Sequence, residues 1–147
     1  MASTAEKVRS EQDFFHELCF YTLSHGDFSF IHQHVVDAFA AQTVGPNDKP
    51  IKLTFALVGL YLHVEKQFTG RQVQQAHMKL GRRKQAWPVF ELPEDRGEIT
   101  VDDVLSCEPG PDRDQSINDW CVCVWNAFRN QKAVVVELLR ENEILSS

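Results

Sequence analysis

Apolar residues recur every three or four positions along most of this chain, which is the period of a helix that buries one face. Apolar and polar residues nowhere alternate for long enough to predict a sheet. The sequence therefore predicts an all-α fold, a compact bundle of four to five main helices. The stretches with helical periodicity are 10–26, 28–42, 50–68, 70–83, 113–129 and 131–143.

A long irregular connection interrupts this pattern at residues 85–113. It holds four of the six prolines, and proline breaks the hydrogen-bond ladder of a helix. Within it, Thr100 and Asp103 have the spacing of a capping box, which predicts one short helix at 101–106. Residues 1–10 are polar and carry no apolar run, so we expect a flexible N-terminus there.

Length and composition fit a single helical domain spanning 1–147, with 43% hydrophobic and 24% charged residues. A net charge of −6 argues against a nucleic-acid partner, because phosphate binding requires clustered lysine and arginine. The longest apolar stretch, 53–64, is too short and too polar to span a bilayer. Because the first residues lack the pattern of a signal peptide, we expect a cytoplasmic protein with no membrane partner.

Candidate functional residues gather in two neighbouring helical stretches, where imidazoles and carboxylates are interleaved. Such groups are the usual material of metal sites and acid–base chemistry. Helical geometry divides them: His32 turns inward, about 50° from the centre of the apolar stripe, His34 lies on its flank, and Asp37 lies nearly opposite. The residues in question are His25, His32, His34, Asp37, His63 and Glu65.

Glu65 lies on the apolar side of its predicted helix, where a carboxylate is costly unless it is paired, hydrogen-bonded or protonated. His32 also faces inward and is the natural partner to propose. A buried His32–Glu65 hydrogen bond would fix the packing of the stretches 28–42 and 50–68. The alternative is that Glu65 reaches solvent at the end of its helix.

A divalent metal is a second interpretation of the same residues. His25, His32, His63 and Glu65 could converge from separate helices, with His32, His63 and Glu65 as the central ligands. No HxxxH or ExxH pair occurs, and His32 and His34 are separated by two positions, which turns their rings apart on a helix. No cofactor is therefore assured by the sequence.

Arg96 is the remaining polar candidate, in the turn Asp95-Arg96-Gly97 of the long connection. Its guanidinium could bind an anion or pair with a carboxylate over a pocket. Long connections in compact domains often carry function, but anchoring of the connection is the favoured interpretation of this arginine.

The stretch 31–42, IHQHVVDAFAAQ, resembles the H-x-x-x-V-D-A-Y-x-x-Q-H motif of an uncharacterised, mostly bacterial family, domain of unknown function 5946. Together the matching pieces cover about residues 14 to 130. The resemblance implies a helical fold but no activity. Thr43 stands where the family often has a histidine, and a cysteine pair is missing, so a metal site using those groups would be incomplete. The other matching pieces are Val58–Leu62 with Glu65, Trp87-Pro88, Asp95-Arg96-Gly97, Thr100-Val101 with Asp103-Val104, and Trp120 with Trp125.

The sequence favours a binding or interaction module over an enzyme, because it contains no recognised catalytic motif. A homodimer is one expectation, since Phe30, Val122 and Trp125 fall off the apolar stripes of their helices. A small-molecule ligand bound between the stretches 28–42 and 50–68, beneath the long connection, is another. The rival hypothesis is a metal-dependent enzyme resembling the DinB-like helical bundles.

Overall fold

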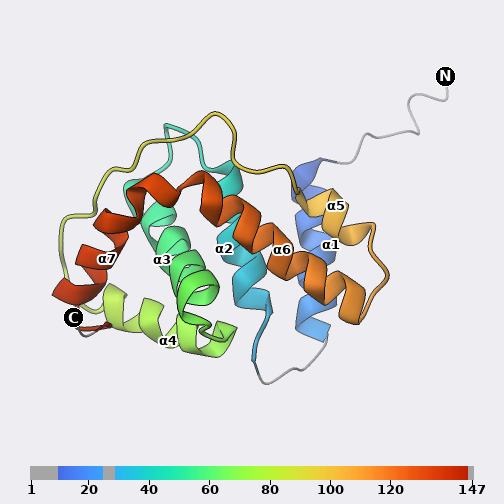
Figure 1. The fold of residues 1–147 in the computed structure, drawn as a ribbon, viewed down its shortest axis with the longest axis horizontal. Helices are drawn as coiled ribbons and strands as arrows, with labels where there is room; N and C mark the ends of the chain where they lie inside the picture. The colour runs from blue at the N-terminus through green and yellow to red at the C-terminus, as the bar shows by residue number, and fades with distance from the viewer. Residues whose placement is uncertain (1–9, 25–28, 146–147) are drawn as a thin grey trace.

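The computed structural model describes residues 10–24 and 29–145, and this part of the chain is helical without any strand (Figure 1). The predicted all-α fold is confirmed. A 3-10 turn at Arg129–Gln131 precedes the last helix. The helices are α1 (Glu11–Ser24), α2 (His32–Thr43), α3 (Pro50–Lys66), α4 (Gly70–Gly81), α5 (Val101–Leu105), α6 (Pro111–Ala127) and α7 (Lys132–Glu141).

Helix α3 is the centre of the bundle and packs against α2, α4, α6 and α7. An unbroken run, Ala56–Leu62, is buried, as expected of a helix covered on all sides. Pro50 opens α3 at a position where a missing N–H costs nothing. Thr69 caps α4 through a capping box with Gln72, so α3 and α4 are joined tightly.

Helix α2 lies against α3 on one side and α6 on another, and it also contacts α1 and α4. It begins at His32 because Phe30 has a left-handed backbone with φ of 60°, which no helix continues through. The predicted start of this helix at residue 28 lies outside the described residues. With so many neighbours, α2 has almost no side left for solvent.

The long connection leaves α4, runs beside α7 and crosses the top of the bundle to α5 (Figure 1). The short helix predicted within it is present as α5, with the Thr100–Asp103 capping box. The connection is held at intervals along its length. Gln131 donates to Glu91 O and accepts from Glu91 N, both at 2.7 Å, and the N–H of Glu98 donates to Cys123 Sγ at 3.0 Å.

Arg96 and Gln42 fasten the connection to the C-terminal end of α2. The Arg96 guanidinium donates to the carbonyl oxygens of Pro93, Ala41, Gln42 and Val44, and so satisfies carbonyls that a helix end leaves without partners. Arg96 thus serves as an anchor in this structure. Gln42 in turn accepts from Trp120 Nε1 at 3.0 Å and donates to Ile99 O at 2.7 Å.

Trp125 is completely buried within this chain, although the sequence placed it off the apolar stripe of its helix. Its indole N–H donates to Glu65 Oε2 at 2.7 Å, and its ring packs against Tyr61. Helix α6 buries this second face because α3 and the turn before α7 cover it. No helix within residues 10–24 and 29–145 is long and apolar enough to cross a membrane.

Replacing Gln42 with leucine should lower the free energy of unfolding by about 2–4 kcal/mol. The change leaves the buried Trp120 N–H and the Ile99 carbonyl without partners while adding apolar volume. Urea denaturation followed by tryptophan fluorescence measures the loss. Gln75→Leu on the exposed side of α4 is the control and should stay within about 0.5 kcal/mol of the wild type. Equal effects at both positions would contradict the role given to Gln42.

Candidate functional site

The rings of His34 and His63 stack on each other where α2 crosses α3. Their centroids lie 3.5 Å apart and the planes are inclined by 16°. His34 is 5% exposed, although the sequence placed it on the flank of α2. It is buried because α3 covers that flank. Two imidazoles that the sequence assigned to different surfaces therefore form one unit.

His63 is held in place by hydrogen bonds at both ring nitrogens. Nδ1 lies 3.1 Å from Phe68 O, and Nε2 lies 3.1 Å from the side-chain oxygen of Asn118 on α6. Burial lowers the pKa of His63, and the bonds to Phe68 and Asn118 oppose that shift. A neutral ring satisfies both contacts if the amide of Asn118 is turned to donate, since amide O and N are exchangeable by rotation.

Charge limits what the stacked pair can do. Two imidazolium rings in face-to-face contact would repel strongly in a partly dry site. The stacked arrangement therefore disfavours a doubly protonated pair. The pair can accept one proton from a bound group or release one to it, which is the elementary requirement of acid–base function.

A pocket of about 480 Å³ opens onto this pair, between α3, α6 and the start of α4. The volume lies in the range of small-molecule sites, which are typically apolar with a few convergent polar groups. The polar lining comes from Ser29, Gln67, Thr69, Asn118 and the two histidines. The apolar wall comes from Ile31, Val64, Phe68 and Val122, so Val122, one of the residues on which the homodimer expectation rested, lines a pocket.

Asp37 lies one turn beyond His34 on α2, and it is 3% exposed instead of pointing away from the core as expected. Gln33 Nε2 donates to Oδ1 at 3.1 Å, whereas Oδ2 has no hydrogen-bond partner within the described chain. Burial raises the pKa of Asp37 well above its usual range, against the opposing effect of Gln33. Oδ2 lies over Gly59, only 1.9 Å from where a Cβ at that position would be.

His32 and Glu65 do not pair with each other, so the interpretation of a buried His32–Glu65 bond is wrong. His32 Nδ1 lies 2.9 Å from Thr22 Oγ1 on α1, and burial lowers its pKa. Glu65 accepts from Trp125 and forms an ion pair with Lys132 Nζ at 2.6 Å. Burial raises the pKa of Glu65, but the bonds from Lys132 and Trp125 outweigh it and lower the value overall.

The candidate metal ligands are also separated. His32, His63 and Glu65 each have a different partner, and His25 lies outside the described residues. Within residues 10–24 and 29–145, no three His, Cys, Asp or Glu side chains are grouped so as to hold a metal ion. The stacked rings of His34 and His63 direct their lone pairs along parallel planes, and therefore not to a common ion.

Asn118 is a site residue that the sequence did not indicate. Nothing in its spacing on α6 distinguishes it, because its role depends on how α6 lies across α3. Phe30, also expected to support a dimer, has Arg71 Cζ 4.8 Å from its ring centroid. The homodimer and the metal site stay predictions from the sequence.

Comparison with known proteins identifies the family of this chain. Residues 6–129 match the family described as "Family of unknown function (DUF5946)". The chain belongs to this family. No curated protein and no solved structure matches it. The matched stretch includes both stacked histidines, Asp37 and Asn118, and it ends before α7.

Asp37→Asn should stabilise the protein increasingly as pH rises. The folded pKa of Asp37 is raised, so the wild-type carboxyl stabilises the fold below the unfolded pKa near 4 and loses that contribution as pH rises toward the folded pKa. The difference between variant and wild type should grow by about 1.4 kcal/mol per pH unit within that window. Urea denaturation from about pH 4 to pH 8 measures it.

Asp119→Asn is the matched control, because exposed Asp119 accepts the same i,i+4 bond from Gln115, at 3.0 Å. Its difference from the wild type should stay flat across the range. A flat difference at Asp37 as well would show that this carboxyl has the same pH-dependent free energy in the folded and unfolded chain.

Gly59→Ala should destabilise the fold by about 1–3 kcal/mol, because the new methyl overlaps the Asp37 carboxylate. In an Asp37→Ala background the same substitution should cost at least about 1 kcal/mol less, because the overlapping atoms are gone. A double-mutant cycle by chemical denaturation measures this coupling. Additive effects would contradict the contact.

Proposed function

We propose that this protein is a binding module that takes a small organic acid, an apolar body bearing a carboxyl group, in the pocket at His34 and His63. The observation that carries the proposal is the stacked imidazole pair at the edge of a pocket with an apolar wall. The metal-dependent enzyme is not proposed, because its three central ligands are engaged with Thr22, Asn118 and Lys132.

The chemistry of the lining selects this class of ligand. The described residues that line the pocket include no carboxylate, so an incoming carboxylate meets no like charge from them. The imidazole pair accepts one proton, and a carboxylic acid brings one. The complex is then an imidazolium–carboxylate contact, which is stronger than a neutral hydrogen bond because both groups are charged.

The apolar wall supplies the remaining selectivity. Ile31, Val64, Phe68 and Val122 can cover an aliphatic or aromatic body, at roughly 25 cal/mol for each Å² removed from water. The first turn of α4 does not compete for the carboxylate. Its Arg71 N–H donates to Ser29 O and its Gln72 N–H to Thr69 Oγ1.

The ring signals of His34 and His63 should respond to carboxylates and not to the matching amides. The test titrates a fragment set of phenylacetate, phenylpropionate, hexanoate and octanoate, each beside its primary amide, into protein with ¹³C-labelled histidine. Affinity should fall about tenfold per pH unit above the pKa of both partners, because the complex holds a proton that the separate partners then lack.

His63→Phe keeps a flat ring for stacking but leaves His34 as the one imidazole of the pair, and it should strongly weaken carboxylate selectivity. His16→Phe, on the exposed side of α1, is the control and should bind as the wild type does. Amides that bind as well as the acids, or carboxylates that leave both histidine spectra unchanged, would refute the proposal.

A further inference from the structure

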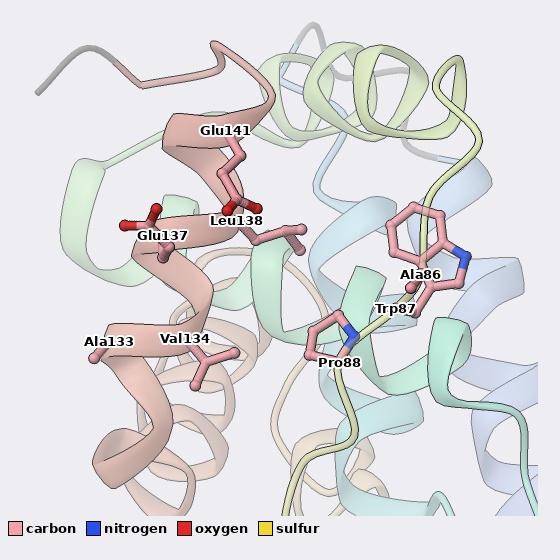
Figure 2. A pocket seen from close by; sticks show the side chains of 8 residues that line it. All are labelled: Ala86, Trp87, Pro88, Ala133, Val134, Glu137, Leu138 and Glu141. Atoms are coloured by element: carbon pink, nitrogen blue, oxygen red, sulfur yellow. The ribbon is translucent and has the colours of Figure 1, made fainter.

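A second hollow, of about 500 Å³, separates α7 from the first part of the long connection (Figure 2). It shares no lining residue with the histidine pocket. Val134 and Leu138 point from α7 toward Pro88, which closes the other side (Figure 2). The Trp87 ring packs edge-on against the Phe55 ring, with the two centroids 5.4 Å apart, so the connection is fixed beside this groove.

The groove exposes apolar surface that the fold does not use. Val134, which lines the groove, is 44% exposed, whereas Val89, one residue beyond Pro88, is 83% exposed and lines a different hollow. An exposed apolar lining of this kind is typical of interaction sites in soluble proteins. An apolar side chain of a partner would be covered here on both sides.

The connection also presents main-chain groups beside the groove. The backbone N–H and C=O groups of Trp87 and Val89 make no hydrogen bond within the described chain. In an extended segment, residues two apart present these groups along the same edge. An added extended peptide could pair with that edge, which is a common mode of peptide recognition. This segment is held at both ends. Trp87 packs on Phe55 at one end, and Glu91 is hydrogen-bonded to Gln131 at the other.

Charge on α7 favours a basic partner. Glu141 inclines toward the Leu138 side of the groove, and Glu137 stands one turn earlier on the outer side of the helix (Figure 2). Within the described residues, the Glu141 carboxylate forms no ion pair, and Glu137 has only an exposed contact with Arg140 at 3.8 Å. Arg83 is engaged with the main-chain oxygen of Glu141 at 2.7 Å. The Glu141 carboxylate therefore remains available to a cation, and Glu137 could also reach one by leaving its exposed contact with Arg140.

We propose that this groove binds an extended segment of a partner protein in which a large apolar side chain is flanked by lysine or arginine. The apolar side chain enters between Pro88 and Leu138, the cations reach Glu137 and Glu141, and the partner main chain pairs with Trp87 and Val89. This interaction is independent of the histidine pocket. It also depends on α7, which lies beyond the stretch that matches the family.

The test selects random dodecapeptides by display on the full-length protein and measures the affinity of enriched peptides by fluorescence polarisation. Enriched sequences should carry lysine or arginine beside a leucine, phenylalanine or tryptophan. Glu137→Gln with Glu141→Gln, and separately Val134→Asp, should each weaken binding about tenfold or more. Met78→Asp places a charge at another exposed apolar residue, 58% exposed on α4, and should have no effect.

A separate variant tests the proposed main-chain pairing with the partner. Val89→Pro removes one N–H that makes no internal hydrogen bond and should weaken binding, whereas Val89→Ala keeps that N–H and should largely retain it. Far-ultraviolet circular dichroism confirms that each variant is folded. Selection that enriches acidic peptides or no common pattern, or peptides whose binding ignores the Val134 and glutamate variants, would overturn the proposal. A concentration-dependent dimer abolished by Val134→Asp would also overturn it, because the groove would then bind a second copy.

Discussion

The close approach of α2 and α3 is the constraint on which the rest of the structure depends. Gly59 leaves a space on α3, and the carboxylate of Asp37 occupies it. Any side chain at position 59 would push the two helices apart. At this separation His34 and His63 meet face to face, and α6 can cover α2 from another side. The same contact forces a carboxyl group into the core, where only Gln33 donates a hydrogen bond to it within the described chain.

The helices could be predicted because their signals are local. Pro50 opens α3, Thr69 caps α4, and Thr100 with Asp103 caps α5, and each of these acts within one turn of its own position. The remaining helices could be predicted from the periodicity of apolar residues. Phe30 has a left-handed backbone conformation, which is uncommon for residues other than glycine, and its residue type did not indicate this. Residues 29–31 are therefore not part of the α-helix, although the apolar pattern included them.

The candidate site could not be predicted in the same way, because its contacts depend on how different helices pack against one another. A helical wheel assumes one buried and one solvated side, yet α2 is enclosed on nearly all sides, so the apparently polar Asp37 and His34 are buried. The polar partners of His32 and Glu65 could not be predicted for the same reason. His32 finds Thr22 on α1, and Glu65 finds Lys132 on α7, and neither position can be known before those helices are placed.

The long connection is held to the bundle at several points along its length, and this limits the effect of a change in its length. It is fastened at Trp87 by Phe55, at Glu91 by Gln131, at Arg96 by the carbonyls of α2, and at Glu98 by Cys123. The connection therefore behaves as several short loops, each with its own entropy cost of closure, and not as one long loop. A residue inserted between two fastenings would bulge within its own span and leave the neighbouring spans in register. Variation in length can therefore accumulate at the surface of this bundle without reaching its core.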